Sequence, residues 1–152
     1  MDDFRYIDTF GAIAEASGRL EAELNRELQE EVGMPLAWLE VLLRISRSAD
    51  QQMTMSELAT QITLTSGGTT RLLDRMISAE LVERIPCPTD RRVIYAVLAS
   101  KGKRELGQAI KHHQRSLERL LSPLSTTELT TLQELMRKIK ENINSEKSAT
   151  SS

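Results

Sequence analysis

Apolar side chains recur at steps of three and four residues along the first third of the chain, which is the spacing of one helix face. The first such run covers residues 4–31, and a second begins near Pro35 and ends at the polar stretch 46–52. Gly33 lies between the runs and is typical of a helix stop, whereas proline is typical of a first helical turn. We therefore predict two helices, with Pro35 in the first turn of the second.

Caps and turns divide the middle third of the chain. Thr54 and Glu57 fit a capping box that opens a short helix, and a tight connection at 63–65 leads to a second one. Two strand-like stretches follow, separated by a segment whose prolines and aspartate favour a hairpin turn. Two short helices followed by a β-hairpin are a winged helix-turn-helix. The second helix, first strand, hairpin tip and second strand are predicted at residues 66–79, 81–85, 86–92 and 93–98.

The last third is helical again. A run from 101 to 121 is broken at Pro123, and a second capping box at Ser125 and Glu128 opens a helix that ends near residue 143. Residues 144–152 are small and polar, so we expect a disordered tail. The predicted fold class is mainly α with a small β-hairpin wing, that is, a winged helix-turn-helix flanked by long helices.

The helix predicted at 66–79 has one face suited to a DNA groove. At about 100° per residue its apolar residues share one face, which Thr69 joins, and the opposite face carries small polar residues and arginine. A helix with so little bulk can enter a major groove about 12 Å wide and reach base edges. Gly67 and Gly68 allow close approach to a DNA strand, although they can equally well only loosen the first helical turn.

The predicted hairpin tip carries Asp90, Arg91 and Arg92. An arginine on a projecting loop can insert into a minor groove, and an aspartate two residues earlier can pair with it and fix its direction. The alternative is a solvated turn with an ordinary ion pair. Because a helix-turn-helix precedes this hairpin, we favour the DNA-binding interpretation.

Charge is distributed unevenly along the chain. The formal net charge of −2 argues against a nucleic-acid binder, which usually has a basic surplus. However, residues 1–50 carry −6, residues 51–104 carry +3, and residues 105–152 carry +1. The winged segment is therefore the basic one, and the overall charge argues only against indiscriminate binding.

Composition excludes several classes of protein. No apolar run could span a bilayer, and the N-terminus lacks the basic and apolar stretches of a secretory signal. A single cysteine cannot form an internal disulfide, which fits the reducing cytoplasm. The sequence carries no phosphate-binding glycine loop and no nucleophile–base pair, so we expect neither an enzyme nor a bound cofactor.

Short motifs in the middle of the chain carry a family resemblance. They read SELA, LTSGGTTRLLDRM, LVER and PTDRR, and they begin at residues 56, 64, 81 and 88, with Leu98 and Gly102 following. In this combination and at this separation they resemble the MarR family of bacterial transcriptional regulators. The motifs cover about residues 54–102, and the flanking helices match the family in order and length.

The resemblance implies a homodimeric, ligand-responsive repressor that binds a pseudo-palindromic operator in double-stranded DNA. It implies that Arg92, oriented by Asp90, enters the minor groove, and that Thr89 and Arg91 touch the DNA backbone. The residues it places in the major groove are Ser66, Gly67, Gly68, Thr69, Thr70, Arg71 and Arg75. The runner-up function is a winged helix used as a protein-interaction module without sequence-specific DNA binding.

The resemblance also implies that the long flanking helices interleave between two protomers, since they carry more apolar length than one winged-helix module covers. The alternative is a monomer with a helical cap. The predicted domains are a helical dimerisation region at 1–33 and 101–143, a winged helix-turn-helix DNA-binding domain at 34–100, and a disordered tail at 144–152.

The family often has a ligand cleft between the dimerisation helices and the winged helix. Candidate lining residues, each of which could also be plain core, are Phe10, Ile13, Trp38, Leu42 and Leu106. We hypothesise that a small apolar or phenolic anion binds there and loosens DNA binding.

Two positions depart from the family pattern. Glu80 stands where the family usually has glycine, so it must adopt a helix-terminating geometry that glycine accepts more easily. Ala99 stands where threonine is usual, so we expect the cap of the next helix to pass to Ser100.

A thiol and a histidine pair invite other chemistry. Cys87 lies beside the predicted wing, where Arg84 and Arg91 could lower its pKa, but we expect a bystander thiol. His112 and His113 point about 100° apart on a helix and lack further ligands, so we expect no metal site.

Overall fold

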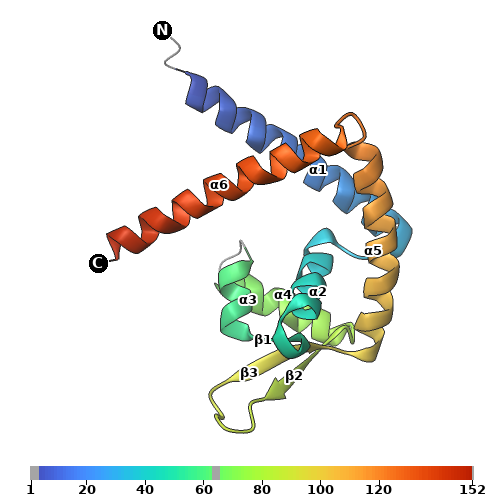
Figure 1. The fold of residues 1–152 in the computed structure, drawn as a ribbon. Helices are drawn as coiled ribbons and strands as arrows, with labels where there is room; N and C mark the ends of the chain where they lie inside the picture. The colour runs from blue at the N-terminus through green and yellow to red at the C-terminus, as the bar shows by residue number, and fades with distance from the viewer. Residues whose placement is uncertain (1–3, 63–65, 152) are drawn as a thin grey trace. The chain divides into compact units, whose positions relative to one another are not determined.

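The computed structural model describes residues 4–62 and 66–151 (Figure 1). The chain divides into two compact units, Met1–Ser116 and Leu117–Ser152, which are described separately below. The architecture is mainly helical with a small antiparallel sheet, as predicted. These units differ from the regions predicted from the sequence, because the first helix and most of the fifth belong to the same unit as the winged helix.

The first two helices are α1 (Arg5–Val32) and α2 (Leu36–Arg47). Gly33 ends α1 with φ of 74°, a left-handed conformation that suits glycine, so the predicted helix stop is confirmed. Pro35 caps α2 from outside rather than occupying its first turn, a difference of one residue. The Asn25 side chain accepts a hydrogen bond of 3.0 Å from the Leu36 backbone N–H, which ties α1 to the start of α2.

The helix-turn-helix consists of α3 (Met55–Gln61) and α4 (Ser66–Ser78). Thr54 and Glu57 form the predicted capping box, in which each side chain accepts a hydrogen bond from the other residue's backbone N–H. The predicted connection at 63–65 lies outside the described residues. A short 3-10 turn, η1 (Ala49–Gln51), precedes strand β1 (Gln52–Thr54), and neither element was predicted.

The wing is the hairpin of β2 (Val82–Pro86) and β3 (Ile94–Leu98), and it projects from the rest of its unit in Figure 1. The sheet order is β1-β3-β2, and both pairs are antiparallel. Both predicted strands are confirmed to within one residue at each end. The unpredicted strand β1 pairs with β3, where Met53 stands opposite Ala96.

The core of the first unit lies where α1, α2, α4, the sheet and helix α5 (Ser100–Leu120) meet. The side chains that are less than 2 % exposed are Leu28, Met34, Leu39, Val41, Leu42, Ile45, Leu58, Leu73, Met76, Leu81 and Val82. From α5, Leu106 and Ala109 are buried as well. The helices α1 to α5 all contribute buried apolar residues to this core, whereas the N-terminal part of the apolar face of α1, with Phe4, Ile7 and Phe10, is exposed.

The start of α5 differs from the sequence prediction. The Ala99 carbonyl accepts a hydrogen bond of 3.0 Å from the Lys103 backbone N–H, so Ala99 is the cap residue and Ser100 is the first residue of the helix. The expectation that the cap passes to Ser100 is wrong. The Ala99 backbone N–H also donates to the Leu81 carbonyl at 3.0 Å, which fixes Ala99 at the end of the sheet.

The second unit contains the end of α5, a turn and helix α6 (Thr126–Thr150). Ser125 and Glu128 form the predicted capping box. The predicted disordered tail is wrong, because α6 continues to Thr150. Hydroxyl groups of Ser145, Ser148 and Thr150 donate to carbonyls four residues earlier, which serine and threonine can do inside a helix.

No helix in the described ranges 4–62 and 66–151 is both long and apolar enough to cross a membrane.

Candidate nucleic-acid interface

Helix α4 has two distinct faces, as its sequence predicts. Leu73 and Met76 are fully buried and anchor one face in the core. Thr70, Arg71 and Arg75 are exposed on the other. The helix therefore presents one hydroxyl and two guanidinium groups outward, and such groups can contact base edges and phosphates.

Thr69 does not belong to that exposed surface. Its side chain is 2 % exposed, so it faces the core rather than the solvent. Its place on the apolar face was anticipated from the helical spacing, but a direct contact of its hydroxyl with DNA does not fit this burial. Ser66, Gly67 and Gly68 form the first turn of α4, so their backbone lies at the N-terminal end of the helix.

The C-terminal end of α4 is held by three backbone hydrogen bonds and one lysine. The Leu81 N–H donates to the Met76 carbonyl at 3.0 Å, and Lys101 Nζ on α5 donates to the Ala79 carbonyl at 3.1 Å. Glu80 has φ of 61°, the left-handed geometry that its position was expected to demand. The end of α4 is therefore fixed to both the wing and α5.

An ion pair joins α4 to the wing. Arg84 Nη2 on β2 lies 2.5 Å from Asp74 Oδ1 on α4, and both side chains are about half-exposed. The sequence analysis did not find this pair, because ten residues and a change of element separate its members. It links strand β2 to the helix and leaves Arg71 and Arg75 outside the pair.

The wing tip carries the predicted aspartate–arginine pair. Asp90 accepts three hydrogen bonds from Arg92: from its backbone N–H at 3.0 Å, from Nε at 3.2 Å and from Nη2 at 3.3 Å. These donors hold the pKa of the Asp90 carboxyl below its usual value, because they stabilise its charged form. The Arg92 side chain is 91 % exposed, so it is oriented and still accessible.

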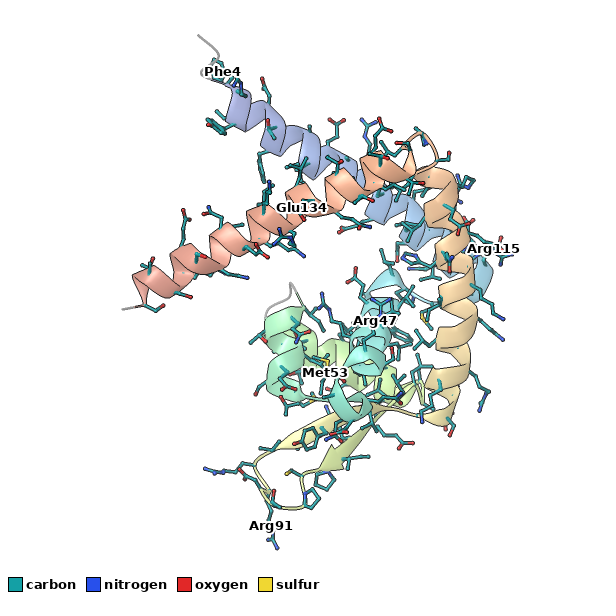
Figure 2. The ribbon with its side chains drawn as sticks, viewed as in Figure 1. Phe4, Arg47, Met53, Arg91, Arg115 and Glu134 are labelled. Atoms are coloured by element: carbon teal, nitrogen blue, oxygen red, sulfur yellow. The ribbon has the colours of Figure 1, made fainter. Side chains whose placement is uncertain are left out.

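Arg91 lies at the end of the hairpin and points away from the sheet (Figure 2). Thr89, Arg91 and Arg92 are all exposed, and Asp90 is half-buried. The wing therefore ends in two cations of which one is directed by a carboxylate. Arg71 and Arg75 of α4 and Arg91 and Arg92 of the wing tip are therefore all exposed.

Comparison with known proteins shows similarity to one family. A model of the MarR family matches residues 32–93, which include α2, both helices of the helix-turn-helix, β2 and the wing tip. The crystal structure of AbsC, a MarR family transcriptional regulator from Streptomyces coelicolor, superposes with a TM-score of 0.83 at 28% identity and covers 95% of this chain and 97% of AbsC. The chain is therefore similar to regulators of the MarR family along most of its length.

Two other relatives extend the comparison. YsmB of Bacillus subtilis, an uncharacterized HTH-type transcriptional regulator, is 33% identical over 87 residues, which are 57% of this chain and 60% of YsmB. A cysteine-to-serine mutant of MarR from E. coli, solved in complex with operator DNA, has a TM-score of 0.78 at 29% identity and covers 91% of this chain and 99% of MarR. AbsC and YsmB are both named as transcriptional regulators.

Cys87 lies between β2 and the wing tip, where its neighbours are hydrogen-bonding groups. Its Sγ lies 3.3 Å from Thr89 Oγ1, and hydrogen bonds from the Thr89 side chain and from the backbone of Thr89 and Asp90 lower the pKa of the thiol. Arg84, one of the two arginines that could have lowered this pKa, is paired with Asp74 instead. The physical cause is hydrogen bonding rather than a nearby guanidinium.

The five residues predicted for a ligand cleft differ widely in exposure. Phe10 is 70 % exposed on α1, whereas Leu42 and Leu106 belong to the core. Ile13 and Trp38 are half-buried. Two cavities beside α2 are lined by other residues. None of the five lines either of these two cavities, and the predicted cleft stays a prediction.

Proposed function

We propose that this DNA-binding regulator of the MarR family acts as a homodimeric, ligand-responsive repressor that binds a pseudo-palindromic operator. The observation that carries the proposal is the Asp90–Arg92 pair, which directs an exposed arginine from the tip of a wing that is itself fixed to α4. A regulator of this kind works in the cytoplasm, where bacterial DNA lies, and it needs no cofactor and catalyses no reaction.

The proposed contacts divide between the two grooves of DNA. In α4, Arg71 and Arg75 have the donors to read guanine or to hold phosphate, and Thr70 can accept or donate at a base edge. The backbone of Ser66, Gly67 and Gly68 lies at the helix N-terminus, which favours a phosphate. In the wing, Arg92 enters the minor groove, and Thr89 and Arg91 contact the DNA backbone. We leave the Thr69 hydroxyl out because it is buried.

A homodimer is supported by two exposed apolar surfaces, one in each compact unit. On α1, Phe4, Ile7 and Phe10 are each more than 60 % exposed. On α6, the exposed stripe consists of Leu132, Leu135, Ile139 and Ile143. Soluble proteins rarely leave such surfaces open to water, and two copies of the chain would bury them.

The runner-up function is a protein-interaction module without sequence-specific DNA binding. It assigns no role to the exposed arginines of α4 and the wing tip. A docking surface for protein does not require an arginine that a carboxylate aims outward from a wing. The two functions therefore differ in what removal of Arg92 does to salt-dependent binding of duplex DNA.

The test is a footprint on the region upstream of the chain's own gene, followed by binding titrations at several salt concentrations. We expect Arg92→Ala to weaken binding across sequences and to reduce the salt slope by about one phosphate equivalent. Arg71→Ala should reduce discrimination between bases, by about 1–3 kcal/mol if it reads one base pair. Arg115→Ala, at an exposed position on α5, is the matched control. It should change neither the salt slope of binding nor the discrimination between bases. Absence of salt-dependent binding to any duplex from that region contradicts the proposal.

A further inference from the structure

Two cavities lie along one side of α2 and share two of its residues. The first, of about 520 Å³, is lined by α2, β1 and α3. The second, of about 570 Å³, is lined by α1, α2 and Ile62. Glu40 and Arg44 belong to both walls, so the cavities adjoin. We call the two together the α2 cleft, and each is within the size range of small-molecule sites, about 300–1,000 Å³.

The α2 cleft is polar and its charges are separated. Glu40, Arg44 and Arg47 follow one another at four- and three-residue steps along α2, so they share one helix face. Glu21 of α1 joins Glu40 at one end, and Arg44 and Arg47 form the other. Arg44 Nη1 donates to Gln61 Oε1 of α3 at 3.3 Å. Figure 2 labels Arg47 at the C-terminal end of this row.

The acidic end is not neutralised by the protein. Glu21 and Glu40 form no ion pair within 4.0 Å among residues 4–62 and 66–151. Burial in the cleft and the nearby charge of Glu21 raise the pKa of Glu40, and Arg44 only partly opposes them. A cation placed between the two carboxylates would therefore be stabilised.

The middle of the cleft supplies an apolar surface. Leu43 of α2 is half-buried and Met53 of β1 is 3 % exposed, and both line the first cavity. A compact apolar body can pack there while its polar groups reach the two charged ends. An anion alone would satisfy the arginines but would also approach Glu40.

We infer that the α2 cleft binds a small zwitterion, with its amine at Glu21 and Glu40, its anionic group at Arg44 and Arg47, and its apolar body against Leu43 and Met53. This inference deepens the ligand-responsive part of the proposed function and rests on it for the regulatory consequence. It replaces the simple anion expected from the sequence with a ligand of both charges.

Occupancy of the cleft would act on the helix-turn-helix through α3. The ligand touches α1, α2 and β1 together with Gln61 and Ile62 at the end of α3, which leads toward α4. A ligand that binds one arrangement of these elements better than another shifts the chain toward that arrangement. We expect operator affinity to change when the cleft is filled.

Three probes that share one apolar body test the ligand class on the full chain. They are L-phenylalanine, which carries both charges, 3-phenylpropionate, which carries only the carboxylate, and 2-phenylethylamine, which carries only the amine. Trp38, the only tryptophan, lies on α2 two residues before Glu40 and provides a fluorescence signal alongside calorimetry. We expect L-phenylalanine to bind at least tenfold more tightly than either single-charge probe. Equal or tighter binding of 3-phenylpropionate, or no binding of any probe at millimolar concentration, overturns the inference.

Charge-removing variants test the two ends. Glu40→Gln should weaken L-phenylalanine binding at least tenfold and abolish its advantage over 3-phenylpropionate, and Arg47→Gln should abolish its advantage over 2-phenylethylamine. Glu31→Gln, an exposed position on α1 outside both cavity walls, is the matched control. A thermal melt of each variant verifies that it is folded. Unchanged binding by folded Glu40→Gln contradicts the inference.

Measuring ligand binding without DNA separates this inference from the proposed function. If the chain binds L-phenylalanine with the expected preference but no promoter duplex, the proposed function fails and the ligand class stands. If it binds the duplex but shows no preference among the probes, the ligand class fails and the DNA-binding function stands.

Discussion

Glu80 holds a backbone geometry that its side chain disfavours. With φ of 61° directly after α4, it occupies a left-handed conformation that costs an L-residue roughly 1–2 kcal/mol, whereas glycine adopts it without strain. Glycine also loses more entropy on folding, about 0.5–1 kcal/mol, so the two effects partly cancel. We predict that Glu80→Gly raises the free energy of unfolding by up to about 1 kcal/mol, measured from the denaturant midpoint at constant slope.

The control for this prediction is Ser78→Gly at the last residue of α4, which should lower the free energy of unfolding by about 1 kcal/mol or less. A destabilising effect of Glu80→Gly would mean that the Glu80 side chain contributes more than the strain of its backbone costs.

His113 predicts a dependence of stability on pH. Burial, and then the nearby charge of His112, lower the pKa of His113 below its usual value of 6.5, and its Nδ1 is buried without a hydrogen-bond partner among the described residues. The unfolded chain therefore binds a proton at a higher pH than the folded chain does. Stability is complete above pH 6.5 and is lost as pH falls from there through the folded pKa.

Denaturant unfolding between pH 7.5 and 5.5 measures this loss. His113→Leu should flatten the dependence in that window, because leucine keeps an apolar side chain at a half-buried position and cannot titrate. An equal slope in the variant would assign the effect to another group.

Interactions between near neighbours could be predicted from the sequence, whereas distant ones could not. The Asp90–Arg92 pair follows from a two-residue spacing in a turn, since few geometries are open to it. The Asp74–Arg84 pair depends on how β2 leaves α4, and that direction is set by packing. The burial of Thr69 followed from helical spacing, but the family pattern grouped it with residues that face outward.

At the scale of elements, one glycine fixes how α5 meets the wing. A Cβ built on Gly102 would lie 2.0 Å from the Leu81 carbonyl oxygen, which also accepts the Ala99 backbone hydrogen bond. Since the nearest atoms belong to the Leu81 backbone, they cannot move aside without disturbing the chain. We predict that Gly102→Ala lowers the free energy of unfolding by about 1–3 kcal/mol.

Gly107 on the same helix is the matched control. A Cβ there would meet nothing within 4 Å, so Gly107→Ala should raise the free energy of unfolding by roughly 0.5–1 kcal/mol through helix propensity. Opposite signs in two denaturant titrations support the close approach, and equal signs contradict it.

Elements marked by a motif of adjacent residues could be predicted from the sequence. A strand that forms only by pairing with a distant strand, and the far end of a helix without a stop residue, could not. Both capping boxes were found because their four residues are adjacent in sequence. Strand β1 has three residues and one buried side chain, so no alternating pattern marks it, and it exists through its pairing with β3. The end of α6 was misjudged because small polar residues suggested a tail, although no glycine or proline stops the helix there.

At the scale of the whole molecule, basic and acidic residues are concentrated in different parts of the chain. The segment with the helix-turn-helix and wing carries the basic surplus, and the first fifty residues carry the acidic one. A basic interface on an otherwise acidic chain limits binding to sites where groove contacts add to the electrostatic attraction. The α2 cleft repeats this separation on a smaller scale, since its acidic and basic ends lie along one helix.

Binding of a two-fold operator should depend on the α6 stripe, although that stripe touches no DNA in the proposed function. Two wings can reach half-sites about one helical turn apart only if two protomers are joined. We predict that Leu135→Glu weakens self-association, because it places a charge on an apolar face whose Leu135 side chain is 48 % exposed in one copy. Sedimentation velocity measures the shift to monomer. Operator affinity should fall by a hundredfold or more, on the order of the gain from linking two binding events.

Gln133→Glu adds the same charge to the same helix at a position off the α6 stripe. It should preserve both self-association and operator affinity. A half-site duplex separates the causes, because monomeric Leu135→Glu should bind it as well as the unaltered chain does. If Leu135→Glu stays dimeric, α6 does not form the interface. If it becomes monomeric but keeps full operator affinity, then one winged helix suffices for recognition and the dimeric part of the proposed function is wrong.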